Sequence, residues 1–342
     1  MIKKIIAPEL VDRVQKLIDE AHSFSIVAHV SPDGDACGSA LSMWLYLRSL
    51  KKDVHVVLHD QVAANLRWMP GLEYVIFFDQ EPEKSLQTIE TSEVIICVDF
   101  NAASRLGKLK EAVLVSDAQK VMIDHHLYPE DFCDITISHP QISSASELMY
   151  RLFWQMGVQR QLSNEAATVI YTGMMTDTGA FTYNSNMFET YYVIADLIQL
   201  GIDKDKIYDR VFNACSENRE RLKGYVLSQK MRLYRDFGAS LFTLEQDELQ
   251  AHHYQKGDSE GFVNIPLSIE GIYFSVFLRE DKEYIKVSLR SKGDFPCNVF
   301  AETYFNGGGH KNASGGEFLG TMAEAVALFE SALPTFYATL KK

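Results

Sequence analysis

The sequence has few cysteines, a deficit of basic residues and no long hydrophobic run. Its 342 residues include five cysteines and no Cys-x-x-Cys pair, which argues against a disulfide framework or a zinc–thiolate site and fits a reducing compartment. The first residues, MIKKIIAPEL, lack the apolar segment of a signal peptide, and no stretch approaches the length of a membrane span. These absences predict a cytoplasmic protein without membrane contact.

The charge balance limits the partners of the protein. Lys and Arg number 33 against 46 Asp and Glu, so the formal net charge is −13. Such a chain lacks the general basic surface that a protein needs to coat a long nucleic acid. A phosphorylated substrate would have to be held locally, by metal ions or by a few placed cations. With 46% hydrophobic and 23% charged residues, the chain has the composition of a globular protein, and its length suffices for two domains.

Hydrophobic patterning predicts an α/β fold in two parts. Short apolar runs alternate with helical patterns up to about residue 176, which is typical of a doubly wound, mostly parallel sheet. The expected strands are 25–30, 54–58, 74–78, 94–99 and 121–124, and the expected helices are 8–21, 38–50, 144–156 and 163–176. From about residue 235 the pattern alternates as in a partly solvated sheet, which predicts a smaller α/β domain with a mixed sheet. We expect a catalytic domain at 1–187, a helical connector at 188–232 and a substrate-binding domain at 233–342, with a cleft between the domains.

Acidic residues and histidines stand where the predicted parallel strands end. The segment HVSPDGDACGSA places His29, Asp33 and Asp35 in the loop after one strand, and Asp99 ends another. A third strand ends in Asp124, His125 and His126, and Asp177 follows a helical stretch at a glycine-flanked turn. Any one of these residues is more often a turn former or a helix cap. Because the carboxyl ends of parallel strands meet at one edge of the sheet, their combination predicts a shared site.

The types of side chain at this edge favour a transition metal. Carboxylates with imidazole and no thiolate suit manganese or another first-row divalent ion; zinc is less natural, and calcium is disfavoured because it prefers oxygen ligands. The carboxylates of this set, Asp33, Asp35, Asp99 and Asp177, would balance two divalent cations. Two such ions activate water and clamp a phosphoryl group in an in-line displacement. The expected reaction is therefore metal-assisted hydrolysis of a phosphoester.

A glycine-rich segment near the C-terminus, FNGGGHKNASGG, is a second candidate site. Its glycines, among them Gly308 and Gly309, carry no Cβ, so their backbone N–H groups can approach an anion, and His310 follows at once. Arg290 lies on a preceding strand pattern and can bind a phosphate with two parallel hydrogen bonds. A plain glycine turn surrounded by solvated cations explains the same residues, and the loop alone does not decide between the two readings.

These motifs together resemble the DHH phosphoesterase family. VMIDHH carries the Asp-His-His signature, HVSPDGDACGSA, VDF and MMTDTGAF resemble the other metal motifs in the same order, and NGGGH resembles the motif of the DHH-associated C-terminal domain. The resemblance implies one ion held by His29, Asp33 and Asp99 and a second held by Asp35, Asp99, His125 and Asp177. It also implies that Asp124 orients a ligand histidine and that His126 faces the scissile phosphate, as hydrogen-bond donor or as acid. Arg290, Gly308, Gly309 and His310 are then expected to bind the substrate.

Within the family, the chain most resembles the nano-RNase and pAp-phosphatase type. This implies a Mn²⁺-dependent enzyme that hydrolyses very short oligoribonucleotides to mononucleotides and removes the 3′-phosphate of 3′-phosphoadenosine 5′-phosphate (pAp). The alternatives are a phosphodiesterase for cyclic or linear dinucleotides and a nucleotide-binding sensor without catalysis. Arg105, which follows Asp99 in SRLG, is interpreted as a helix-start or surface residue rather than a phosphate ligand. The oligomeric state stays open, with a homodimer among the options.

Overall fold

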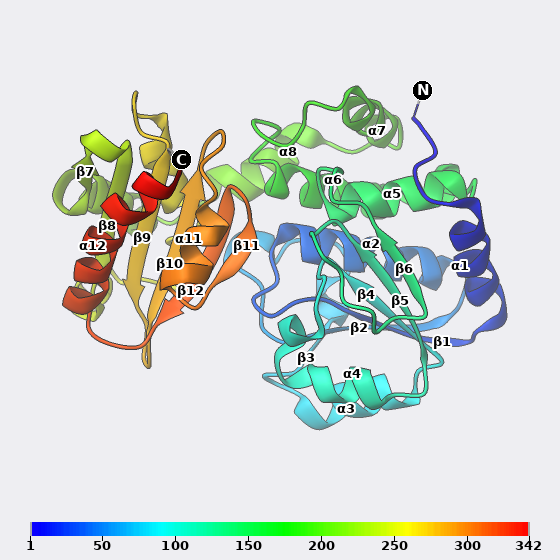
Figure 1. Ribbon diagram of the computed structural model, residues 1–342. Coiled ribbons are helices and arrows are strands. Elements are labelled where there is room, and N and C mark those ends of the chain that lie inside the picture. Colours follow the sequence, from blue (N-terminus) through cyan, green and yellow to red (C-terminus); the bar gives the residue numbers. More distant parts are fainter. Residues whose placement is uncertain (1, 341–342) are drawn as a thin grey trace. The chain divides into compact units, whose positions relative to one another are not determined.

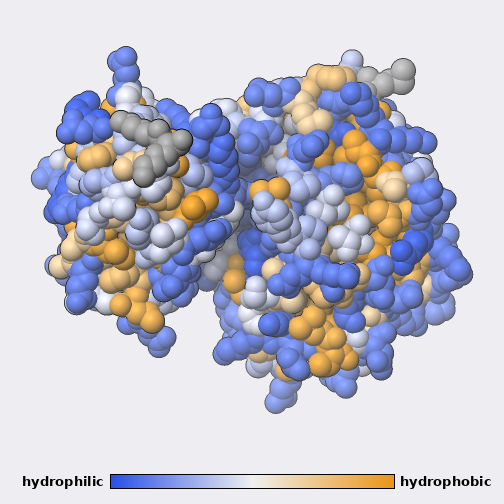
Figure 2. Space-filling view, viewed as in Figure 1, coloured by the Kyte–Doolittle hydropathy of each residue, from blue (hydrophilic) through white to orange (hydrophobic). Residues whose placement is uncertain are grey.

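The computed structural model describes residues 2–340, and the chain divides into two compact units, the first ending at Ala214 and the second beginning at Cys215. This division lies inside the stretch 188–232 that the sequence predicts as a connector; the predicted domain roles and the predicted cleft stay predictions. Within residues 2–340, no helix is long and apolar enough to cross a membrane. Hydrophilic side chains cover most of the face of each unit that Figure 2 shows.

The first unit is built on a six-stranded sheet in which all neighbouring strands are parallel (Figure 1). Its strands are β1 (Ser23–Val27), β2 (Asp53–Leu58), β3 (Ile76–Phe77), β4 (Val94–Val98), β5 (Gln119–Asp124) and β6 (Ile135–Ser138). The order across the sheet is β3-β2-β1-β4-β5-β6, so the winding reverses between the neighbours β1 and β4. This is the doubly wound arrangement, and it confirms the predicted fold class of this part of the chain.

Helices cover both faces of this sheet: α1 (Pro8–Glu20), α2 (Gly34–Ser49), α3 (Pro82–Thr91), α4 (Lys110–Val115), α5 (Ala145–Gln155) and α6 (Asn164–Asp177). Two further helices, α7 (Phe188–Gln199) and α8 (Lys204–Tyr208), pack on this helical layer, against α6. Side chains alternate between the two faces of a strand, so Ile26 of β1 packs in the core that contains α2, α5 and α6, whereas Val27 packs with α3 and α4. The strands are therefore buried on both sides, which is why their sequences are almost continuously apolar.

The second unit contains a mixed six-stranded sheet with the order β11-β12-β10-β9-β8-β7. Its strands are β7 (Arg232–Tyr234), β8 (Ala239–Leu244), β9 (Phe274–Glu280), β10 (Ile285–Ser291), β11 (Gly308–His310) and β12 (Ala313–Phe318), and its helices are α9 (Glu217–Tyr225), α10 (Gln246–Ala251), α11 (Cys297–Tyr304) and α12 (Met322–Leu340). Strands β8 and β9 are parallel, and the other pairs are antiparallel. One face of the sheet forms a core with α11 and α12, as Val287, Phe300 and Phe329 show. The mixed sheet of this part was predicted, and the prediction is confirmed.

The structure corrects several predicted boundaries. Helix α2 begins at Gly34 rather than at residue 38, because the Asp33 side chain caps its N-terminus by accepting hydrogen bonds from two backbone N–H groups. The expectation that Asp35 lies in a loop is therefore wrong, since Asp35 belongs to the first helical turn. Strand β6 and helix α3 were not predicted. Helix α3 buries only Ser85 and Ile89, so few apolar residues mark it in the sequence.

Candidate metal centre

The candidate residues lie at the carboxyl edge of the parallel sheet, where its winding reverses. His29 stands two residues after β1, Asp99 directly follows β4, and Asp124 is the last residue of β5. Strands β1, β4 and β5 are neighbours in this order, so the loops after them run side by side. Open α/β sheets bind ligands in the crevice outside this point. The topology alone thus brings residues from three distant parts of the sequence to one place.

Helix α2 delivers two more carboxylates. Asp33 Oδ1 accepts hydrogen bonds from the backbone N of Asp35 at 2.9 Å and of Ala36 at 3.0 Å. Asp35 is 1% exposed, and its two carboxylate oxygens accept hydrogen bonds from Ala145 N at 2.6 Å and Ser146 N at 2.8 Å. These N–H groups open helix α5, and a helix N-terminus is a favourable place for an anion. The carboxylate of Asp35 is therefore fixed even though it is buried.

Two glycines allow helices α2 and α5 to approach helix α6 closely. A Cβ on Gly34 would lie 2.2 Å from Oγ1 of Thr176, and a Cβ on Gly173 would lie 2.0 Å from Oγ of Ser146. Neither position has room for a larger residue without displacement. This close approach brings the first turn of α2 beside the end of α6, where Asp177 is the last helical residue. The carboxylates of Asp35 and Asp177 consequently face the same space.

Two histidines direct their Nε2 atoms towards these carboxylates. His29 Nδ1 lies 2.8 Å from the carbonyl of Val30, and His125 Nδ1 lies 3.2 Å from the carbonyl of Ile142. Since a carbonyl can only accept, Nδ1 is the protonated nitrogen of each ring. His29 Nε2 is then 3.4 Å from Asp99 Oδ2, and His125 Nε2 is 3.5 Å from Asp99 Oδ1. Such backbone partners fix the imidazole orientation that a metal ligand requires.

These contacts form two groups of side chains. Within each group, the side chains lie close enough together to hold one ion. His29, Asp33 and Asp99 form the first, and Asp35, His125 and Asp177 form the second; in each, the candidate ligand atoms lie within 4.8 Å of one another. Asp99 lies between the groups, because one of its oxygens faces His29 and the other faces His125. The structure thus brings together all six residues that the sequence analysis assigned to metal. Their role as ligands stays a prediction.

Asp99 shows why these residues fit a cation. It is 2% exposed, and its Oδ1 atom is buried with no hydrogen-bond partner among residues 2–340. Its φ of 61° is a left-handed conformation that non-glycine residues rarely adopt, and such strain concentrates at functional sites. A buried carboxylate whose two oxygens face the Nε2 atoms of two neutral imidazoles is unfavourable unless protons or cations lie between them. A divalent ion in each of the two groups would satisfy these atoms.

Burial and mutual charge shift the pKa values in this cluster. Burial and then the charges of Asp99 and Asp177 raise the pKa of Asp35 well above its usual value. Burial opposes the charged form of His125, but the neighbouring carboxylates, Asp99 foremost, raise its pKa well above normal. Burial also opposes the charge of Asp99, yet the imidazoles of His125 and His29 lower its pKa well below normal. Without metal, the cluster therefore retains protons that a bound cation would displace.

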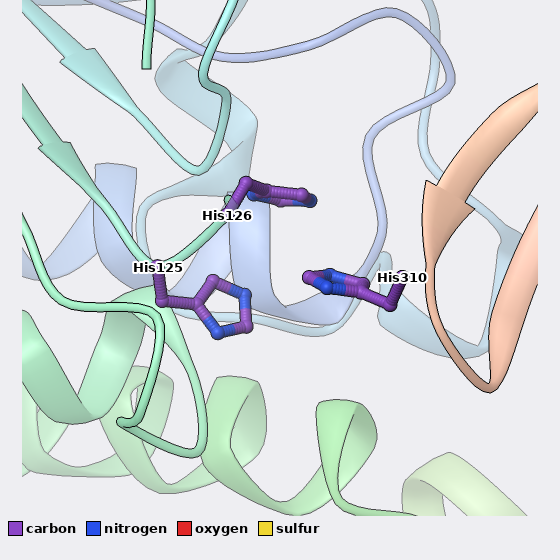
Figure 3. Close-up of side chains that lie close together, drawn as sticks. All are labelled: His125, His126 and His310. Atoms are coloured by element: carbon purple, nitrogen blue, oxygen red, sulfur yellow. The ribbon is translucent and has the colours of Figure 1, made fainter. Parts of the chain in front are cut away.

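His126 is held by a different set of contacts. Its Nδ1 lies 2.7 Å from Asp124 Oδ1, its backbone N donates to Asp124 Oδ2 at 3.0 Å, and its Nε2 lies 2.8 Å from Nη1 of Arg105. A guanidinium group only donates, so Nε2 accepts from Arg105 and Nδ1 carries the proton that Asp124 accepts. Asp124 therefore orients His126, whereas the resemblance had suggested that it orients a ligand histidine. Figure 3 shows the rings of His125 and His126, which meet edge to face with centroids 5.0 Å apart.

Arg105 is the residue of this site that the sequence interpretation missed. It belongs to the short helical segment Ala103–Leu109, and its carbonyl accepts a hydrogen bond from Val30 N at 2.8 Å, which ties the segment to the end of β1. Its guanidinium is half-buried beside His126. The only signal in the sequence was its position six residues after Asp99, and a single arginine in a loop is too common to interpret.

In the second unit, the glycine-rich segment forms a tight hairpin between β11 and β12. A Cβ on Gly307 would lie 2.0 Å from the carbonyl of Gly315, and Gly309 has a φ of 136°, so both need glycine for the backbone itself. Gly308, in contrast, faces open space, with its nearest heavy atom 4.0 Å away. His310 ends β11, as Figure 3 shows, and the strand register places it in one row with Ala313 and Arg290. Neighbouring strands are about 4.8 Å apart, which puts His310 and Arg290 roughly 10 Å from each other.

Together, these features define an α/β protein with a doubly wound sheet, a His/Asp candidate metal centre at its winding reversal and a second unit with a mixed sheet. The chain belongs to the DHH family of phosphoesterases: the DHH family N-terminal domain matches residues 23–174, and the DHHA1 domain matches residues 246–337. This confirms the resemblance on which the sequence interpretation relied.

Three known proteins are similar to this chain over most of its length. The crystal structure of an exopolyphosphatase-related protein from Bacteroides fragilis is 52% identical and has a TM-score of 0.96, with 100% of both chains covered. The "bifunctional oligoribonuclease and PAP phosphatase NrnA" of Thermus thermophilus is 29% identical over 296 residues, which are 86% of this chain and 84% of that protein. The "cyclic-di-AMP phosphodiesterase PdeA" of Listeria monocytogenes is 25% identical over 335 residues, 95% of this chain but 49% of that protein.

Proposed function

We propose that this protein is a Mn²⁺-dependent phosphoesterase that hydrolyses very short oligoribonucleotides to mononucleotides and removes the 3′-phosphate of pAp. The observation that carries the proposal is the buried carboxylate of Asp99: its unsatisfied Oδ1 faces Nε2 of His125 and its Oδ2 faces Nε2 of His29. This arrangement calls for cations at the switch point of a doubly wound sheet. The substrate class is supported by the similarity to the Thermus thermophilus protein, which covers most of both chains.

The six clustered side chains would hold two ions, with Asp99 shared between them. His29, Asp33 and Asp99 would bind one ion, and Asp35, Asp99, His125 and Asp177 would bind the other. Carboxylate and imidazole donors without thiolate suit manganese. When bound, two divalent ions supply an activated water and neutralise charge on the phosphoryl group.

The groups around His126 would handle the phosphate itself. Arg105 Nη1 donates to His126 Nε2 at 2.8 Å, so a phosphate that replaces this hydrogen bond would accept from the guanidinium with one oxygen and contact the imidazole with another. Asp124 accepts the Nδ1–H hydrogen bond of His126 and would stabilise the imidazolium formed if Nε2 took up a proton from solvent. That imidazolium could then donate the Nε2 proton to the departing oxygen and return to the neutral ring.

The second unit would bind the remainder of the substrate. Arg290 and His310 stand in one row of the sheet, and the exposed backbone of Gly308 and Gly309 lies beside them. The net charge of −13 leaves a longer strand little to hold, which favours short substrates.

The test is a side-by-side turnover assay with Mn²⁺ on a dinucleotide, a five-residue RNA, a long RNA, pAp and cyclic di-AMP. We expect rapid turnover of the dinucleotide and pAp, slower turnover of the five-residue RNA and none of the long RNA. Preferred cleavage of cyclic di-AMP would overturn the substrate assignment in favour of the activity named for the Listeria monocytogenes protein. Binding of these nucleotides without any turnover would instead favour the sensor. A matched control is Asp117→Asn, an exposed carboxylate that should not affect any of these rates.

A further inference from the structure

A buried ion pair in helix α5 lies outside the six clustered side chains and has no part in the chemistry proposed above. Glu147 and Arg151 are both 0% exposed, and Nη2 of Arg151 donates to Oε1 of Glu147 at 2.6 Å. Nε of Arg151 donates to the same oxygen at 2.8 Å. A buried ion pair contributes little stability, because the cost of removing two charges from water offsets their attraction. This pair therefore calls for an explanation other than stability.

The second oxygen of Glu147 connects the start of α5 to α7. Oε2 accepts a hydrogen bond from Ser143 Oγ at 2.5 Å and another from Thr190 Oγ1 at 2.9 Å. Ser143 belongs to the segment through which the chain enters α5, residues 142–146, which we call the entry segment. Thr190 lies in the first turn of α7. The carboxylate thus fastens the entry segment to both helices.

The entry segment supplies the hydrogen-bond partners of two candidate metal ligands. The carbonyl of Ile142 lies 3.2 Å from Nδ1 of His125. The backbone N–H groups of Ala145 and Ser146 donate to the carboxylate of Asp35 at 2.6 Å and 2.8 Å. A displacement of this one segment would therefore disturb both ligands together.

These contacts concern one of the two ion groups. Asp35 and His125 belong with Asp177 to the second group, and Asp177 is followed by the loop that leads to α7. The first group takes its hydrogen bonds elsewhere: His29 faces the carbonyl of Val30, and Asp33 accepts from the backbone of α2. The entry segment is thus specific to the second group.

We infer that Glu147 is a positioning residue for the second ion: by fixing the entry segment, it holds Asp35 and His125 in the orientation that the ion requires. The inference rests on the proposed function, because it concerns an ion of the proposed centre. Groups that orient metal ligands typically change metal affinity by about 10- to 100-fold when they are removed. Glu147 acts one step further out, through Ser143, so the lower end of this range is expected for the loss of that link.

Ser143→Ala is the variant that tests this role. It removes one hydrogen bond from Oε2 of Glu147 and leaves the ion pair intact, whereas Glu147→Gln would leave Arg151 buried without a counter-ion and endanger the fold. The matched control is Ser42→Ala, since Ser42 is also buried and its Oγ donates within α2, to the carbonyl of Ser39. In calorimetric titration with Mn²⁺, Ser143→Ala should weaken the second ion roughly tenfold, and Ser42→Ala should leave both ions unchanged.

Two background variants identify the ion that is affected. Asp33→Asn weakens the first group, while its remaining side-chain oxygen still caps α2, and Asp177→Asn weakens the second group. Adding Ser143→Ala should weaken the ion that remains in Asp33→Asn and leave the ion that remains in Asp177→Asn unchanged. An equal loss in both backgrounds would overturn the inference, because it would show a general loss of structure.

Amide hydrogen exchange tests the same role without metal. In EDTA, the N–H groups of Ala145 and Ser146 should exchange faster in Ser143→Ala than in wild type, and Ser42→Ala should leave their exchange unchanged. Equal effects of the two serine variants on exchange or on Mn²⁺ affinity would refute the positioning role. If the wild-type protein binds no Mn²⁺, the proposed function fails, whereas the exchange rates still decide whether Ser143 and Glu147 hold the partners of Asp35.

Discussion

Replacing Asp99 by Asn is the most direct perturbation of the candidate metal centre. Asparagine has the same shape and tolerates the left-handed φ of 61°, so the substitution removes one charge without forcing the backbone to change. In the wild-type protein, one oxygen of Asp99 lies 3.4 Å from His29 and the other lies 3.5 Å from His125. Both proposed ions would therefore lose the same charged ligand.

The expected loss can be bounded from the contacts. Removing a residue that only supports a metal ligand already costs about 10- to 100-fold in metal affinity. Asp99 would be a direct ligand of both ions, so each should bind more than about 100-fold more weakly, or about 2.7 kcal/mol. Hydrolysis should fall by at least about a hundredfold, because the two ions supply the chemistry.

The assay is metal content after dialysis, followed by calorimetric titration with Mn²⁺. Wild type should retain two ions per chain, and Asp99→Asn should retain fewer than one under conditions where Asp117→Asn, the exposed control, retains both. An Asp99→Asn variant that holds two ions with wild-type affinity would refute the shared-ligand assignment. A wild type that binds only one ion would refute the binuclear centre while leaving the fold untouched.

Three further predictions follow from the same contacts. Because the pKa of Asp35 and that of His125 are raised on folding, the metal-free protein should lose stability as the pH rises above their ordinary values, about 4 for Asp35 and about 6.5 for His125. A falling Tm in EDTA measures this loss; with Mn²⁺ the trend should reverse, since binding requires deprotonated ligands. Arg105→Lys should lower kcat/KM by about tenfold with unchanged metal content, since Lys lacks the planar fork; Lys108→Gln in the same segment is the control, and equal losses in both would contradict the role of Arg105. Gly173→Ala should destabilise the protein by about 1–3 kcal/mol in chemical denaturation, because its Cβ would meet Ser146 Oγ at 2.0 Å, whereas Gly224→Ala, with nothing within 4 Å of its Cβ, should not.

The sequence was sufficient for the fold class and for the six clustered side chains because both depend on local patterns. Apolar strands that alternate with helices predict a doubly wound sheet, and the switch-point rule then places His29 and Asp99 together without knowledge of any contact. Residues recruited through tertiary packing could not be found in this way. Arg105 reaches His126 only because its own backbone is bonded to Val30. Thr190 of α7 meets Glu147 of α5 only in the folded chain.

Residues with an unusual backbone conformation or an unusually buried charge lie where we propose function. In the first unit, Asp99 combines a left-handed backbone with a buried oxygen that lacks a partner, and Asp35 is a carboxylate buried to 1% exposure. Both arrangements cost folding free energy in the metal-free protein, and the proposed divalent ions would offset that cost by neutralising the clustered carboxylates. Selection for function tolerates such a cost where a ligand offsets it, so the cost supports the proposed metal centre.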